Sequence, residues 1–155
     1  YSLSQSVISL IFLTYAFGMV SSSVAGGLAD RFGRRPLLIA GFLIMLVGIG
    51  LTLADSFGLI FGGVVLVTTG FFIAHSVASG SIGPLAGASK GHAASLYLLF
   101  YYMGSSIVGS LGGWFWQHGG WTGVGLFIAA LLAVVLEHPR LDDGIHRAGF
   151  LQKPQ

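Results

Sequence analysis

Residues 26–38 read GGLADRFGRRPLL and place one aspartate and three arginines within six positions. The chain of 155 residues has seven Lys or Arg and five Asp or Glu, so a third of its charged residues lie in this segment. No charged residue occurs in the 29 positions before Asp30 or in residues 36–54. The sequence therefore alternates long uncharged runs with short charged segments.

The uncharged runs have the length of membrane spans. They cover residues 1–29, 36–54, 56–89 and 91–136. A helix needs about 20 apolar residues to cross a bilayer, so each of the first three runs fits one span. The fourth fits two, divided at the polar, glycine-rich sequence QHGG of residues 117–120.

The composition also favours a membrane protein, because only 8% of the residues are charged, against about 25% in an average soluble domain. We therefore predict an all-α, polytopic bundle of five transmembrane helices. The expected spans are residues 5–29, 37–54, 57–84, 94–117 and 120–137, followed by a tail at 138–155.

Other classes of site are not expected. The chain has no cysteine, which excludes disulfides and cysteine metal sites. Its histidines outside the spans are scattered over different loops, so we expect neither a metal nor a cofactor. A net charge of +2 gives no electrostatic footprint for nucleic acid. The chain starts at Tyr1 without a visible signal peptide, so we expect a fragment that has lost a helix before Tyr1.

The basic residues predict the orientation. Basic residues remain in the cytoplasmic loops of membrane proteins. With five spans all seven fall on one side, which places the first end outside and the last end in the cytoplasm. Three tryptophans flank the outer turn at residues 117–120, where amphipathic rings favour the headgroup level. The residues are Arg31, Arg34, Arg35, Lys90, Arg140, Arg147 and Lys153 on the inside, and Trp114, Trp116 and Trp121 on the outside.

The charged segment itself has the residues of a tight turn between two helices. Gly26 and Gly27 permit close approach of a second helix. Gly33 permits a reversal, and Pro36 suits the first turn of the next helix. Asp30 can accept hydrogen bonds from a helix start or pair with an arginine. A simple positive-inside anchor with a turn is the alternative interpretation.

The segment closely resembles the cytoplasmic signature of the major facilitator superfamily, G-x-L-a-D-r-x-G-r-[kr]. The resemblance implies a partial major facilitator fold and a secondary active transporter of small molecules. It also implies that the segment braces the cytoplasmic gate. The matching residues are Gly27, Leu28, Asp30, Arg31, Gly33, Arg34 and Arg35.

Within that family the fragment corresponds to helices two to six or eight to twelve. We favour eight to twelve, the C-terminal half. The third span has no arginine, and GSSIVGSLGGWFW at residues 104–116 resembles a glycine-rich penultimate helix without the Gly-Pro pair of antiporters. SKGHAA at residues 89–94 resembles the R-G-x-A start of helix eleven, with Lys90 in place of arginine. The nearest resemblance is to bacterial inner-membrane exporters of drugs or sugars.

A candidate pathway follows one face of the third span, where Thr68, Phe72, His75 and Ser79 recur at helical spacing. Apart from tyrosines, His75 is the only ionisable residue well inside a span, and such residues usually face a cavity or the bundle interior. It could bind substrate or relay protons, and the alternative is a neutral histidine bonded to a neighbouring helix. Further candidates for a polar aromatic pathway are Tyr15, Ser22, Tyr97, Tyr101 and Tyr102.

Small residues recur every fourth position in two stripes, which predicts close helix packing, with a role in gating motion as the alternative. Pro84 is expected to end or bend the third span. The stripes are Ser105, Gly109 and Gly113, and Gly83, Gly87 and Gly91.

The main functional hypothesis is proton-coupled efflux of drug-like or sugar-like solutes, with no enzymatic activity. The expected partners are the missing N-terminal helical half, membrane lipids and a small-molecule substrate, but no nucleic acid. Asp30, Asp55 and Glu137 do not lie in mid-span, so the coupling residue is not identified. The alternatives are an intramembrane hydrolase that uses Ser79 or Ser81 with a histidine, and a non-transporting structural membrane subunit.

Overall fold

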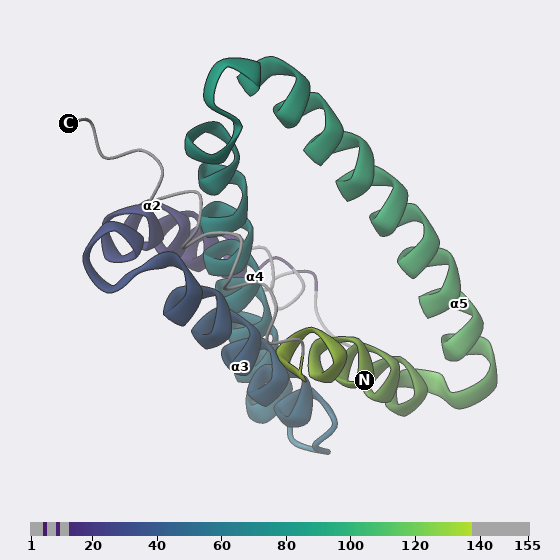
Figure 1. Cartoon of the computed structure of the whole chain (residues 1–155). Coiled ribbons are helices and arrows are strands. Elements are labelled where there is room, and N and C mark those ends of the chain that lie inside the picture. The colour runs from purple at the N-terminus through teal and green to yellow at the C-terminus, as the bar shows by residue number, and fades with distance from the viewer. Residues whose placement is uncertain (1–4, 6–8, 10–12, 138–155) are drawn as a thin grey trace.

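The computed structural model describes residues 5, 9 and 13–137, and every regular element in this part of the chain is helical (Figure 1). The expected tail at 138–155 lies outside the described residues, as does most of the start of the span expected at 5–29. The elements are α2 (Thr14–Phe32), α3 (Arg34–Thr52), α4 (Phe57–Ala86), the short 3₁₀ helix η1 (Gly87–Ser89) and α5 (Lys90–Glu137).

Two helical stretches of the described chain are long and apolar enough to cross a membrane. They are α3 and the continuous stretch Phe57–Glu137, which contains α4 and α5. Helices satisfy their backbone hydrogen bonds internally, which is what a chain in hydrocarbon requires. Large apolar side chains are exposed on all four long helices, as expected for surfaces that face lipid or further helices.

The charged segment is almost entirely helical, which differs from the loop expected at this place. Asp30 and Arg31 belong to the last turn of α2, and Arg34 begins α3. Only Gly33 lies between them, at φ 90° and ψ 154°, and its N–H donates to the Ala29 carbonyl at 3.0 Å. A positive φ is favourable only for glycine, so one residue is sufficient for the reversal.

Helix α4 lies at the centre and packs on both α2 and α3 (Figure 1). A small core of Ala25 and Ala29 from α2 and Val77 from α4 is buried against Leu37 and Leu38 of α3. Apolar side chains of this size allow the three helices to approach closely.

Four glycines bring α3 and α4 into backbone contact. A Cβ at Gly48 would lie 2.8 Å from the Gly63 carbonyl oxygen, and one at Gly70 would lie 2.5 Å from the Gly41 carbonyl oxygen. The residues are spaced by seven on each helix, so two turns separate the two contacts. Each contact excludes any side chain larger than hydrogen.

The glycines of the expected stripes are not in such contacts. In the described structure nothing lies within 4 Å of a Cβ built at Gly109 or Gly113, or at Gly83, Gly87 or Gly91. The space beside Gly26 and Gly27 is likewise open. The close helix packing is therefore at α3–α4 and not at the positions that the spacing of four suggested.

Helix α5 has two parts, separated at Gly120, where φ is 57° and ψ is −151°. The first part stands apart from α2–α4 over most of its length, and the second part returns to α3 (Figure 1). The Trp121 Nε1–H donates to Thr52, with distances of 3.1 Å to Oγ1 and 3.2 Å to the carbonyl oxygen. At the other end of α4, the helix stops at Ala86, two residues after Pro84.

Candidate functional site

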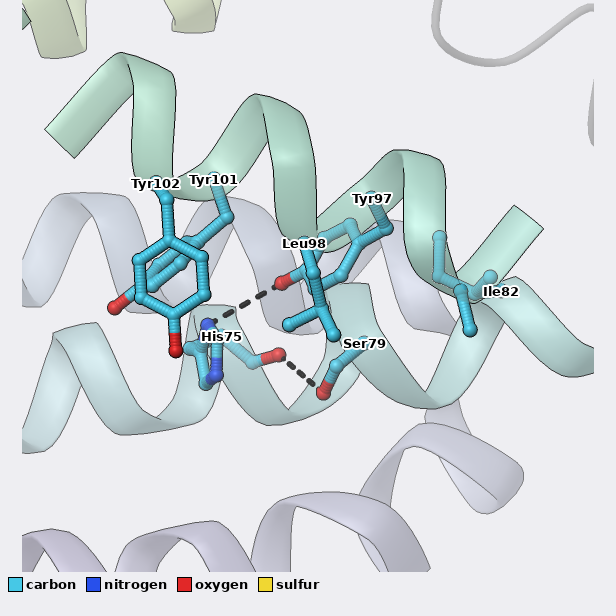
Figure 2. Close-up of a pocket in the computed structure, with 8 residues that line it drawn as sticks. His75, Ser79, Ile82, Tyr97, Leu98, Tyr101 and Tyr102 are labelled. Atoms are coloured by element: carbon cyan, nitrogen blue, oxygen red, sulfur yellow. Dashed lines mark hydrogen bonds between the residues drawn. The ribbon is translucent and has the colours of Figure 1, made fainter. Parts of the chain in front are cut away.

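A pocket of about 440 Å³ lies between α4 and the first part of α5 (Figure 2). Its size is within the usual range for small-molecule sites. One imidazole, three tyrosines and one serine line it, together with apolar side chains. The lining residues are His75, Ser79 and Ile82 from α4, and Ala94, Tyr97, Leu98, Tyr101 and Tyr102 from α5.

His75 is hydrogen-bonded across the two helices. Its Nδ1 lies 3.2 Å from the Tyr97 hydroxyl oxygen (Figure 2). The histidine is half-buried, so it faces both the neighbouring helix and the pocket. The alternative interpretation of His75, a histidine bonded to a neighbouring helix, is thus realised in a position that also lines a cavity. The two interpretations do not exclude each other.

Aromatic rings surround the imidazole. Phe71 stacks on His75 from one turn earlier in α4, with centroids 5.6 Å apart and planes at 10°. Tyr101 lies at 5.1 Å from the imidazole, and Tyr97 stacks on Tyr101 at 6.3 Å. Tyr97 and Tyr101 are four residues apart on α5 and therefore share one helix face. The walls of the pocket are consequently aromatic, polarisable and able to form hydrogen bonds.

The serine hydroxyls of α4 are bonded to their own helix. Ser79 Oγ donates to the main-chain carbonyl of His75 at 2.8 Å, and Ser81 Oγ donates to that of Val77 at 2.6 Å. Such bonds turn a hydroxyl along the helix. Neither serine is therefore oriented toward the imidazole, as a serine–histidine hydrolase would require.

The sequence-predicted pathway residues divide into three groups. His75, Ser79 and Tyr101 line the pocket. Tyr15 reaches it indirectly, because its ring contacts Phe72 at 6.4 Å and Phe72 contacts the Phe71 ring that stacks on His75.

Ser22 and Thr68 are outside the lining. Ser22 contributes its carbonyl oxygen, which accepts a hydrogen bond of 3.1 Å from Ser76 Oγ and joins α2 to α4. Thr68 lies two turns before His75 and does not line the pocket.

Sequence reasoning missed Phe71, Ile82, Ala94 and Leu98. Phe71 carried a usable signal, because it stands four residues before His75 and so lies above it on the same helix face. Ile82, Ala94 and Leu98 carried none, since apolar residues occur throughout both spans.

The charged residues of the segment 26–38 lie at helix ends. Asp30 and Arg31 are exposed at the end of α2, and the Arg31 guanidinium lies 5.3 Å from the Phe32 ring centroid. Arg34 is half-buried and Arg35 is exposed at the start of α3. The described residues that line the pocket include no carboxylate and no lysine or arginine. The pocket therefore suits solutes that bind through rings and neutral polar groups.

Comparison with protein families shows to which family the protein with this pocket belongs. Residues 1–137 match the Major Facilitator Superfamily. The chain belongs to this superfamily. The prediction of an all-α, polytopic membrane protein with a partial major facilitator fold is confirmed, and this major facilitator chain is an integral membrane protein. The C-terminal half, which the motifs indicate, is consistent with these matches.

Curated relatives are transporters by name. Over 133 residues the chain is 50% identical to the inner membrane transport protein YnfM of Escherichia coli, covering 86% of this chain and 32% of that protein. Over 136 residues it is 40% identical to the uncharacterized MFS-type transporter YybF of Bacillus subtilis, covering 88% and 34%. It is 30% identical over 151 residues to the multidrug transporter AQR1 of Candida glabrata, covering 90% and 26%.

This major facilitator chain spans about a third of the length of the first two relatives. No solved structure matched it.

Proposed function

We propose that the protein containing this chain exports small molecules by proton-coupled secondary transport, and that the chain supplies helices eight to twelve. The His75–Tyr97–Tyr101 pocket forms part of the solute pathway. The observation that carries the proposal is a polar aromatic cavity between two predominantly apolar helices. The name of the multidrug transporter among the relatives supports efflux of drug-like molecules.

The pocket provides two kinds of interaction. Ring faces of Tyr101 and His75 can stack on a flat solute, and the Tyr hydroxyls and the imidazole can exchange hydrogen bonds with its polar groups. Histidine is also the side chain whose charge changes most readily near neutral pH. The same residue can thus respond to both solute and proton.

We further propose an inside gate at the charged segment. The gate comprises Gly27, Asp30, Arg31, Gly33, Arg34 and Arg35. In this proposal the segment faces the cytoplasm of a bacterial inner membrane, as the positive-inside rule favours. The exposed Asp30 is available to a helix end of the other half of the transporter, which is the expected partner.

The test uses everted membrane vesicles that contain the complete protein. Two uncharged probes are compared, 4-nitrophenyl glucoside with an aromatic ring and methyl glucoside without one. We expect an inside-acid gradient to drive accumulation of the aromatic probe, and a protonophore to abolish it. His75→Ala should lower the initial rate by about tenfold, the effect of losing about 1.4 kcal/mol of transition-state stabilisation.

The matched control is His92→Ala, because His92 is exposed at the start of α5 and outside the pocket. It should transport at the wild-type rate. Equal rates in both variants at every pH from 5.5 to about 8.5, the range in which histidine titrates, would remove the pocket from the pathway. If the folded wild-type protein moves neither probe in response to the gradient, this result would contradict the export function and favour a structural subunit.

A further inference from the structure

A second cavity of about 390 Å³ adjoins the candidate site on the side of η1. It lies where α4 ends and α5 begins. Its walls are apolar side chains, and Tyr97 is the one lining residue that carries a polar group. The lining residues are Ile82, Leu85 and Ala86 from α4, and Ala93, Leu96, Tyr97 and Phe100 from α5.

The two cavities share walls. Ile82 and Tyr97 line both, so the polar aromatic pocket and the apolar cavity adjoin each other at these two side chains. Tyr97 is amphipathic, with a hydroxyl bonded to His75 and a ring that contributes to the apolar side. A single solute that lies across Tyr97 would therefore meet hydrogen-bonding groups at one end and hydrocarbon at the other.

We propose that the solutes of this protein are uncharged amphiphiles with a polar aromatic head and a short hydrocarbon tail. The head binds beside His75 and Tyr101, and the tail occupies the apolar cavity. This inference rests on the proposed function and specifies its substrate class. A charged head is disfavoured, because the described lining residues of both cavities include no side chain of fixed charge to pair with it.

Bilayer lipid is the other source of hydrocarbon for the apolar cavity. A lipid chain would fill it independently of the polar pocket, whereas a solute tail would couple the two. An experiment must therefore measure whether occupation of the apolar cavity depends on occupation of the polar pocket.

The test measures binding of a series of alkyl 4-hydroxybenzoates, from methyl to hexyl, to the complete protein in nanodiscs. Binding to empty nanodiscs is subtracted. We expect the affinity to rise by about two- to fourfold per methylene until the tail fills the cavity, as burial of hydrocarbon predicts. Tyr101→Ala should weaken all esters by the same factor, because it changes only the head site.

The apolar cavity is altered by Leu85→Ser combined with Leu96→Ser. Both side chains are about half exposed, 46% and 54%, so the change should leave folding intact. The gain per methylene should fall below about twofold, while the methyl ester binds as before, since its head site is unchanged. The control is Leu111→Ser. Leu111 is 44% exposed and lies on α5, as Leu96 does, but outside both cavities. Ala93→Phe provides a second variant, and by filling the cavity it should shorten the longest ester that still gains affinity.

An equal gain per methylene in wild type, the double variant and the control would overturn the inference and place the tail in the bilayer. Failure of every ester to bind would also overturn it. Either result leaves the proposed export function testable by gradient-driven movement of 4-nitrophenyl glucoside. The two failures are thus distinguishable.

Discussion

The hydrogen bond between Tyr97 and His75 restricts how the imidazole can act. A neutral imidazole has one nitrogen that donates and one that accepts. Since Nδ1 is engaged with the Tyr97 hydroxyl, Nε2 is the ring nitrogen that remains for a solute or a proton. In the proposed pathway, Tyr97 therefore determines which ring nitrogen of His75 is available, and it acts as a positioning residue.

Tyr97→Phe should retain the ring and lose only this bond. We expect the free energy of unfolding to fall by about 1 kcal/mol and the pH profile of transport to change. A double-mutant cycle with His75→Ala provides the measurement. If the bond is responsible, the double variant should transport no worse than His75→Ala alone. Fully additive losses would show that the two residues act separately.

At this scale the sequence predicts ionisable residues better than hydroxyl-bearing ones. His75 was identified because a titratable group inside an uncharged run is costly and so has a reason to be there. Helical spacing with His75 predicts Thr68 and polarity predicts Ser22, but a serine or threonine in a helix can satisfy itself on its own backbone. Ser79 bonds in this way and still lines the pocket, which its polarity did not guarantee.

At the scale of elements, the most extensive contact between described helices is the one between α3 and α4. Backbone carbonyls touch glycines of the partner helix at two levels, so dispersion contacts are dense there. The spacing of seven between Gly41 and Gly48, and between Gly63 and Gly70, was present in the sequence. It was overlooked because spacings of four are equally common in this chain, and spacing alone does not identify which face meets a partner.

Gly70→Ala should separate α3 from α4, since the added Cβ would lie 2.5 Å from a carbonyl that cannot move independently. We expect a loss of about 1–3 kcal/mol of stability, the usual cost of overpacking. The thermal midpoint of the complete protein in detergent, followed by size-exclusion chromatography, measures it. Gly62→Ala is the control, because nothing lies within 4 Å of its added Cβ in the described structure. A control as unstable as Gly70→Ala would show that helix contact is not the cause.

The division of α5 also depends on one glycine. Gly120 has a combination of φ and ψ that is available essentially only to glycine. Gly120→Ala should therefore destabilise the protein by about 1–3 kcal/mol. Gly119→Ala, one residue earlier and without a positive φ, should be neutral or slightly stabilising. Identical thermal midpoints for the two variants would contradict a backbone origin for the bend.

At the scale of the whole molecule, successive turns lie at alternating ends of the bundle. The bond from Trp121 to Thr52 brings the break in α5 close to the turn at residues 53–56. The reversal at Gly33 and the segment η1 are at the other ends of these helices. The uncharged runs predicted this alternation, because their lengths fix where the chain must turn. They did not predict how far the first part of α5 stands from α4 (Figure 1).

The membrane orientation can be tested with cysteines, because this chain has none of its own. Ser56→Cys and Ser89→Cys place one thiol at each end, at exposed positions. In an otherwise cysteine-free protein, we expect an impermeant maleimide added to intact cells to label Ser56→Cys only. Ser89→Cys should react after permeabilisation, because the positive-inside rule places Lys90 in the cytoplasm. The reverse labelling pattern would refute the orientation.

Gly33 has a consequence for any relative movement of α2 and α3. Since the two helices are joined by a single non-helical residue, rotation of one against the other is concentrated in two torsion angles. Through such a joint, a displacement of one helix moves the other helix in a defined direction. Lengthening it with added flexible residues would leave both helices formed and yet uncouple them mechanically.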